Sequence, residues 1–232
     1  MEIHRLESDL LKDPLEYRVY LPPCYDQQLQ ERYPVLYLIH GQSYNDEQWD
    51  RLGADETADK LVASGEIPPF IIVMPRDRNW GQPDEDPFGQ VLIDELIPLI
   101  DEQYRTMPDR RQRAVGGLSR GAGWALHLGL SEWELFGAFG AHSLATFWSD
   151  APYIRTWLSE IPAEALPRIY LDVGDRDRPP ILAAAMRFEE LLTQLNIPHE
   201  WYLFPGYHDE DYWAAHVEKY LRWYSQPWST TD

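Results

Sequence analysis

Cysteine is almost absent from this sequence: Cys24 is the only one among 232 residues. No disulfide can therefore form within the chain, and no cysteine cluster offers the ligand spacing of a zinc site. Residues 1–30 also lack a basic segment followed by an apolar one, which is the pattern of a secretory signal peptide. We therefore predict a soluble, cytoplasmic protein.

Long apolar runs and positive charge are scarce as well. No apolar stretch approaches the ~18 residues that a membrane-spanning helix requires. The chain has 20 Lys and Arg against 39 Asp and Glu, which gives a formal net charge of −19. A surface of this charge repels phosphate groups and anionic lipid headgroups, so neither nucleic acid nor a membrane is expected as a partner.

No feature divides the sequence into parts. It contains no Ser/Gly-rich linker, no internal repeat and no low-complexity tract, and 44% of its residues are apolar. A chain of this length can bury one large core. We therefore predict a single domain over residues 1–232, which can exist alone or as a homo-oligomer.

Short apolar runs alternate with helical patterns along the chain. Residues 35–39 and 70–74 are continuously apolar, which is typical of strands buried on both faces. Residues 17–21 alternate instead and are followed by Pro22 and Pro23, as expected of an edge strand. Further strands are predicted at 114–117, 138–141, 169–173 and 201–204, and helices at 55–64, 90–104, 120–130, 179–195 and 211–224. This alternation predicts an α/β fold with a mostly parallel central sheet and helices on both faces.

A nucleophile motif follows one of these strands. Residues 117–121 read Gly-Leu-Ser-Arg-Gly, a G-x-S-x-G sequence that lies between the run 114–117 and the helix 120–130. The motif needs glycines because the serine occupies a cramped strand-to-helix turn, where side chains would collide with neighbouring backbone. This context predicts that Ser119 is the nucleophile of a serine hydrolase with the α/β-hydrolase fold.

A serine hydroxyl needs a base, and in this fold the acid and then the histidine follow the serine in chain order. Three histidines qualify. His199 begins a strand, at the wrong end of the sheet, and His216 lies in an apolar helical stripe. His208 lies four residues after Phe204, in a loop at a strand's carboxyl end. We predict that His208 is the general base.

The base in turn needs a carboxylate that holds its tautomer and stabilises the imidazolium. Asp172, Asp175 and Asp177 cluster where the strand 169–173 ends. Asp172 falls within the strand, whereas Asp175 and Asp177 both lie in the following loop. Their spacing alone does not separate these two candidates.

The predicted oxyanion hole uses backbone groups from two loops. His40, Gly41 and Gln42 follow the strand 35–39. The backbone N–H of Gln42 and the N–H of Arg120, directly after the serine, are expected to stabilise the oxyanion. His40 is expected to form hydrogen bonds within its loop and not to act as a base.

Several segments together resemble the putative esterase family of α/β-hydrolases. The matching segments are residues 18–23, 33–41, 115–121 and 205–209, in the same order as in the family. That family includes esterase D (S-formylglutathione hydrolase), feruloyl esterases, enterochelin esterases and the mycolyltransferases. The resemblance spans about residues 15–224, which is nearly the full chain.

The resemblance implies specific roles for residues of this chain. The family's G-x-S-x-G serine corresponds to Ser119 and its G-x-H-D histidine to His208. Its acid commonly follows a strand as G-x-x-D, which favours Asp177 as the third member of the triad. Its oxyanion donors correspond to the amides of Gln42 and Arg120.

The chain departs from the family pattern at two positions. Arg120 stands where methionine is common, and its cation is expected either to pair with an acidic loop residue or to meet a substrate carboxylate. Tyr207 stands where glycine is common, which is expected to narrow the cleft. Trp49, Trp80 and Trp148 are candidates, with Tyr207, to line an acyl or aryl pocket; the alternative for each tryptophan is that it packs its loop onto the core. The acidic loop around Trp80 is a candidate lid.

These residues predict hydrolysis of a small-molecule carboxylic ester through an acyl-enzyme, on aromatic (feruloyl-like) or short-chain acyl esters. The chemistry requires no metal and no organic cofactor. An acyltransferase, which passes the acyl group to an alcohol as the mycolyltransferases do, would use the same triad. A non-catalytic binding protein is the third hypothesis, and the complete set of Ser119, His208 and Asp177 argues against it.

Overall fold

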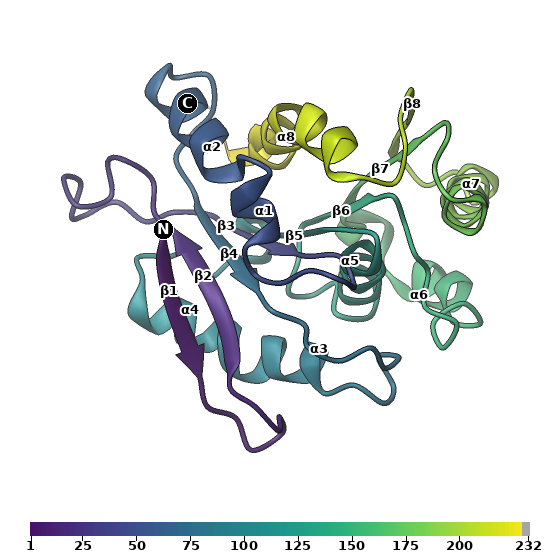
Figure 1. Ribbon diagram of the computed structural model, residues 1–232, viewed down its shortest axis with the longest axis horizontal. Helices are drawn as coiled ribbons and strands as arrows, with labels where there is room; N and C mark the ends of the chain where they lie inside the picture. The colour runs from purple at the N-terminus through teal and green to yellow at the C-terminus, as the bar shows by residue number, and fades with distance from the viewer. Residues whose placement is uncertain (229–232) are drawn as a thin grey trace.

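Short apolar runs build a sheet of eight strands in this computed structural model, which describes residues 1–228. The strands are β1 (Glu2–Leu6), β2 (Leu15–Tyr20), β3 (Val35–Ile39), β4 (Ile71–Pro75), β5 (Arg113–Leu118), β6 (Ala138–His142), β7 (Arg168–Gly174) and β8 (Glu200–Phe204). Their order across the sheet is β1-β2-β4-β3-β5-β6-β7-β8, as Figure 1 shows. From β4 to β8 the paired strands are parallel, whereas β2 pairs antiparallel with β1 and with β4. The predicted mostly parallel sheet is confirmed.

The sheet corrects one prediction about its edge. The run at 17–21 forms most of β2, but β2 is not an edge strand, because β1 pairs with its outer side from Glu2↔Val19 to Leu6↔Leu15. Residues of β1 are exposed or half-buried, so the strand lacks the apolar run that identified the others. Only its pairing with β2 makes it a strand.

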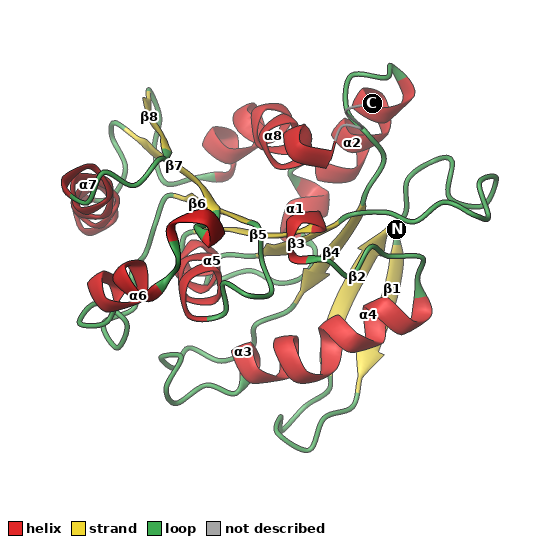
Figure 2. Ribbon diagram, turned by 180° about the vertical axis from the view of Figure 1, so that it is seen from behind, coloured by secondary structure: helices red, strands yellow, loops and turns green. Residues whose placement is uncertain are grey.

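Helices cover both faces of the sheet. They are α1 (Gln48–Arg51), α2 (Ala54–Ala63), α3 (Phe88–Val91), α4 (Ile97–Gln103), α5 (Arg120–Ser131), α6 (Ile154–Glu160), α7 (Pro179–Gln194) and α8 (Glu210–Ser225). Apolar residues of α1, α2 and α8 pack on one face, and those of α3 to α7 pack on the other. Figure 2 shows the two helical layers on opposite sides of the strands. Within residues 1–228, no helix is long and apolar enough to cross a membrane.

All five predicted helices are present, and one of them contains a stretch of a different helix type. The predicted helix at 90–104 is interrupted by a π-helical stretch, Leu92–Leu96, between α3 and α4. Pro98 lies in the first turn of α4 and has no N–H to donate to the preceding turn, which accounts for a local change in helical pairing here. The short helices α1 and α6 were not predicted.

The parallel strands place their carboxyl ends at one edge of the sheet, where ligands bind in open α/β folds. The loops that leave this edge begin with His40 after β3, Arg76 after β4, Ser119 after β5, Asp175 after β7 and Pro205 after β8. These five loops build the site described next.

Candidate active site

Ser119 occupies a strained turn between β5 and α5. Its φ of 56° and ψ of −116° are unusual for a residue with a side chain, and its N–H donates to the carbonyl of His142 at 2.8 Å. A Cβ atom on Gly117 would lie 2.2 Å from the backbone of Gly121, and one on Gly121 would lie 2.1 Å from the Ile39 carbonyl oxygen. Both glycines of the motif are therefore required by close backbone contact, as the sequence predicted.

His208 lies against the serine from the loop between β8 and α8. Its Nε2 is 2.9 Å from Ser119 Oγ, and its Nδ1 is 2.8 Å from Asp177 Oδ1. Because a carboxylate only accepts, Nδ1 carries the proton and Nε2 is free to accept the serine O–H. The ring also meets Trp213 edge-on, with 5.0 Å between centroids. The Nε2–Oγ distance is within the range required for proton transfer from the serine to the histidine, and the Nδ1–Oδ1 hydrogen bond orients the ring.

The two carboxylates of the β7–α7 loop have different contacts. The Asp177 side chain is fully buried against His208 and also accepts the N–H of Arg178 at 2.6 Å. Asp175 is exposed and accepts the N–H of Gly206 at 3.0 Å, which ties the two neighbouring loops together and lowers the pKa of Asp175. The structure therefore brings Asp177, and not Asp175, to the histidine.

The other histidines have contacts elsewhere. His199 Nδ1 contacts the carbonyl of Ile197 at 2.8 Å, and His216 Nδ1 contacts that of Tyr212 at 2.7 Å. A separate histidine–carboxylate pair lies inside the protein, where His142 Nδ1 is 2.6 Å from Asp172 Oδ1 and both side chains are fully buried. The His142 carbonyl of this pair accepts the N–H of the nucleophile at 2.8 Å.

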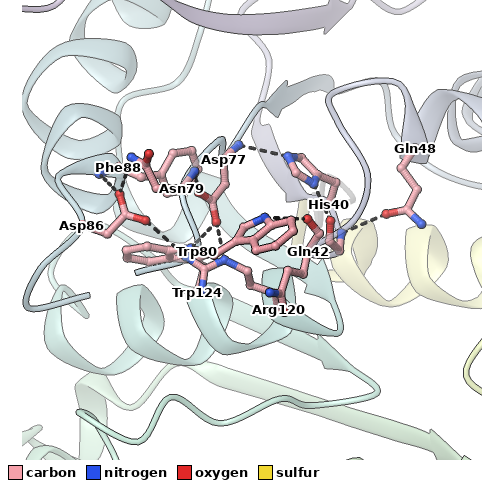
Figure 3. Close-up of polar contacts among 11 residues, drawn as sticks. His40, Gln42, Gln48, Asp77, Asn79, Trp80, Asp86, Phe88, Arg120 and Trp124 are labelled. Carbon is pink, nitrogen blue, oxygen red and sulfur yellow. Dashed lines mark hydrogen bonds and ion pairs between the residues drawn. The ribbon is translucent and has the colours of Figure 1, made fainter. Parts of the chain in front are cut away.

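The loop after β3 is fixed by three side chains. Gln48 accepts the N–H of Gly41 at 2.8 Å, His40 Nδ1 donates to the Gly41 carbonyl at 2.7 Å, and Trp80 Nε1 donates to the Gln42 carbonyl at 3.1 Å. Figure 3 shows these contacts around Gln42. Within residues 1–228, the backbone N–H groups of Gln42 and Arg120 donate no hydrogen bond. The structure thus leaves both predicted oxyanion donors available.

The Arg120 guanidinium decides between the two partners that the sequence left open. Its Nε donates to Asp77 Oδ2 at 2.6 Å and its Nη2 to Asp86 Oδ2 at 3.2 Å, and the arginine is buried over the ring of Phe147. It pairs with acidic loop residues, which is the first of the two alternatives. Burial raises the pKa of Asp77 and of Asp86, and the charge of Arg120 opposes both shifts.

Three of the four aromatic candidates are exposed, whereas Trp49 is buried in the core and donates to the Ile39 carbonyl at 3.0 Å, so it does not line a pocket. Trp80 and Trp148 are each 67% exposed and Tyr207 is 52% exposed, so none of them packs its loop onto the core in the way that buried Trp49 does. Gln82 connects the two tryptophan loops, because its Oε1 accepts the N–H of Trp148 at 2.8 Å.

Sequence reasoning missed three polar residues of this region: Gln48, Asp77 and Asp86. Asp77 follows the carboxyl end of β4, so the rule that reactive residues follow strands could have found it. No motif in the sequence marks Gln48 as the partner of Gly41 or Asp86 as the partner of Arg120. Among residues 1–228, no group of three His, Cys, Asp or Glu side chains is arranged to hold a metal ion.

Comparisons with known proteins identify the family of the chain. The sequence profile of the Putative esterase family matches residues 8–224. An endo-1,4-beta-xylanase/feruloyl esterase of Xylanibacter ruminicola is 38% identical over 173 residues, which are 69% of this chain and 23% of that protein. The chain spans less than half the length of the curated relatives it matches.

Solved structures show the same fold. A ferulic acid esterase superimposes with a TM-score of 0.85 at 26% identity, and 97% of each chain is covered. A feruloyl esterase module from Clostridium thermocellum, complexed with sinapinate, gives a TM-score of 0.81 and covers 100% of this chain and 90% of the module. At 18% identity, the second likeness shows the fold alone.

Proposed function

The chain belongs to the Putative esterase family, and from this membership we propose that it hydrolyses carboxylic esters through an acyl-enzyme on Ser119. The observation that carries the proposal is the continuous hydrogen-bonded chain from Ser119 Oγ through His208 to Asp177, with distances of 2.9 and 2.8 Å. A serine, a base and a buried carboxylate in contact are what nucleophilic catalysis at neutral pH requires.

In the first half of the reaction, His208 Nε2 takes the proton from Ser119 as Oγ attacks the ester carbonyl carbon. The carbonyl oxygen becomes an oxyanion, which the N–H groups of Gln42 and Arg120 stabilise. The tetrahedral intermediate then collapses, the bond to the alcohol oxygen breaks, and His208 gives its proton to the departing alcohol. Asp177 accepts the hydrogen bond from Nδ1–H throughout and stabilises the imidazolium.

In the second half, water replaces the alcohol. His208 removes a proton from the water as its oxygen attacks the acyl carbon, and the same two amides stabilise the second oxyanion. Collapse breaks the bond to Ser119 Oγ, which regains its proton from His208. The products are one alcohol and one carboxylic acid for each ester and water consumed.

An aromatic acyl group is the substrate class that we propose. The Trp80 indole donates to the Gln42 carbonyl, and the backbone of Trp148 is hydrogen-bonded to Gln82 in the loop that carries Trp80. Tyr207 directly precedes His208. Exposed indole and phenol rings around a reaction centre offer stacking surfaces for an aromatic ring. Relatives named as feruloyl esterases support a feruloyl-like ester.

The experiment that tests the function compares wild type with Ser119→Ala on methyl ferulate and on a chain-length series of p-nitrophenyl esters. A fluorophosphonate probe, read by peptide mass spectrometry, reports whether Ser119 is a nucleophile. We expect hydrolysis and labelling in wild type and neither in the variant. A folded wild type that is unlabelled and inactive would overturn the proposal and favour a binding protein, and turnover that needs an added alcohol would indicate an acyltransferase.

A further inference from the structure

The peptide group between Gly41 and Gln42 is held at its carbonyl end. His40 Nδ1 donates to the Gly41 carbonyl oxygen at 2.7 Å, and the N–H of the same peptide group is the Gln42 amide. In a trans peptide the C=O and N–H bonds point in opposite directions within one plane. A hydrogen bond that fixes the carbonyl therefore also fixes the direction of the Gln42 N–H.

His40 is itself fixed by the loop that follows β4. The backbone N–H of Asp77 donates to His40 Nε2 at 3.0 Å, so the ring is neutral with its proton on Nδ1. The Asp77 carboxylate accepts the N–H of Asn79 at 3.1 Å and the indole N–H of Trp124 at 2.9 Å. Asp77 thus connects the oxyanion loop to α5 through its backbone and its side chain.

The Arg120 side chain completes the connection. Its guanidinium joins Asp77 to Asp86, and Asp86 Oδ1 in turn accepts the N–H of Phe88 and the side-chain amide of Asn79, both at 3.1 Å. Figure 3 shows these groups as one cluster beside His40 and Trp80. Arg120, whose backbone supplies one oxyanion donor, is therefore connected through Asp77 to His40 in the loop that supplies the other.

We propose that Arg120, Asp77 and His40 are positioning residues that hold the two oxyanion-hole amides in fixed relative orientation; this inference rests on the proposed function. None of the three side chains contacts the reacting atoms. They act because a donor stabilises an oxyanion only when its N–H points at the place where charge develops. The arginine, a departure from the family pattern, thereby acquires a role in this chain.

The first test replaces Arg120 with methionine, which keeps the apolar stem and removes both ion pairs. Loss of one oxyanion donor costs about 100- to 1,000-fold in kcat, so a loosened donor is expected to cost about 10- to 100-fold in kcat/KM for p-nitrophenyl acetate. KM is expected to change less than about threefold, because uniform binding of the substrate is untouched. Arg120→Lys, which can keep one ion pair, is expected to recover part of the loss.

Arg113 provides the matched control. It is also a buried arginine, and it donates to Asp101 Oδ2 at 2.7 Å, but it begins β5, at the end of the strand opposite Ser119. Arg113→Met therefore removes a comparable ion pair far from the oxyanion loop. We expect it to lower stability while kcat/KM stays within about threefold of wild type.

A pair of substitutions at His40 tests the connection without leaving a buried carboxylate unpaired. The Asn side-chain amide can replace Nδ1 as the donor to Gly41, whereas Ala cannot. We expect His40→Asn to retain at least about tenfold more kcat/KM than His40→Ala. A trifluoromethyl ketone, whose adduct with Ser119 carries an oxyanion, should lose affinity in parallel with kcat/KM in each variant.

The outcomes separate this inference from the proposed function. Parallel losses of kcat/KM and inhibitor affinity in Arg120→Met and His40→Ala, absent from Arg113→Met, support the positioning role. An active wild type whose folded Arg120→Met and His40→Ala variants keep wild-type kcat/KM overturns it, as does an equal loss in Arg113→Met. A folded wild type without esterase activity or Ser119 labelling overturns the proposed function, and the positioning role with it.

Discussion

Asp175 and Asp177 lie two residues apart and have opposite surroundings. Asp177 Oδ1 is 2.8 Å from His208 Nδ1 in a buried contact, whereas the Asp175 side chain is 44% exposed. Replacing the carboxylate that orients a catalytic histidine by an amide costs about 10,000-fold in kcat, because the wrong tautomer results. We therefore expect Asp177→Asn to lower kcat by about 1,000- to 10,000-fold and Asp175→Asn by less than about tenfold. Steady-state kinetics on p-nitrophenyl acetate measures both, and similar losses in the two variants would contradict the assignment.

His40 couples the stability of the protein to pH. Burial lowers the pKa of His40 to about 4, an effect that the charges of Arg76 and Arg120 reinforce and that the Gly41 carbonyl and Asp46 oppose. An unfolded histidine titrates near 6.5, so between about pH 6.5 and 4 the unfolded chain binds a proton that the folded protein does not. The contribution of neutral His40 is therefore complete above pH 6.5 and is lost as the pH falls toward 4.

This loss amounts to about 3 kcal/mol. In His40→Asn the titrating group is gone, so the free energy of unfolding should fall less steeply between pH 7 and 4.5 than in wild type. Urea unfolding at several pH values measures the slope of the free energy of unfolding against pH in wild type and in the variant. Both proteins have the same carboxylates, so the difference between the two slopes reports His40 alone. Identical slopes would contradict the buried, neutral state of His40.

At the scale of elements, α8 is held on the sheet by tyrosine hydroxyls. Tyr212 and Tyr220 donate to Asp172 Oδ2 at 2.5 and 2.8 Å, and the Tyr224 hydroxyl is 3.1 Å from His142 Nε2. The loop with His208 leads directly into this helix, which begins at Glu210. The position of α8 on β6 and β7 therefore also sets the position of the base.

The close approach of α8 to β6 predicts a sharp cost at Gly140. A Cβ atom there would lie 1.9 Å from the Tyr224 hydroxyl, so the buried tyrosine ring or the helix that carries it would have to shift. We expect Gly140→Ala to lower the free energy of unfolding by about 3 kcal/mol, at the upper end of overpacking effects. In Gly81→Ala the nearest contact would be an ordinary 3.4 Å, so the change should stay within about 0.5 kcal/mol. Urea unfolding measures both, and a neutral Gly140→Ala would refute this account of the packing.

At the scale of the whole molecule, one sheet carries two apolar layers. Trp49 is buried in the layer with α1, α2 and α8, and Trp124 is buried in the opposite layer with α3 to α7. Because the same strands support both layers, neither layer can lose its packing without exposing the sheet. We propose on this ground that the chain unfolds as the single domain that the sequence predicts.

Coincident unfolding curves test this proposal. Urea transitions followed by far-UV circular dichroism and by tryptophan fluorescence should share one midpoint in wild type. They should also coincide in Trp49→Phe and in Trp124→Phe, which each remove one buried tryptophan from one layer and so change its share of the fluorescence signal. Two separate midpoints would indicate that the layers unfold independently and that the single-domain prediction is wrong.

The sequence by itself determined the fold and the family, because their signals are local. A strand-like run, a G-x-S-x-G turn and a helical pattern occur within about 20 consecutive residues. The order of the triad along the chain then restricts the catalytic histidine to those that follow Ser119. Both the α/β-hydrolase fold and the esterase resemblance are confirmed. The roles of the site residues, the cytoplasmic location and the oligomeric state stay predictions.

Only the tertiary structure decided which groups meet. From spacing alone Asp175 and Asp177 are equivalent, and the contact with His208 depends on how the β7 and β8 loops pack. Arg120 has carboxylates on both sides because Asp77 and Asp86, 43 and 34 residues earlier in the chain, fold against it. Likewise, β1 is a strand only because β2 supplies its hydrogen-bonding partner. Local pattern fixes the conformation of a segment, whereas the choice among several chemically equivalent partners depends on packing between segments distant in the chain.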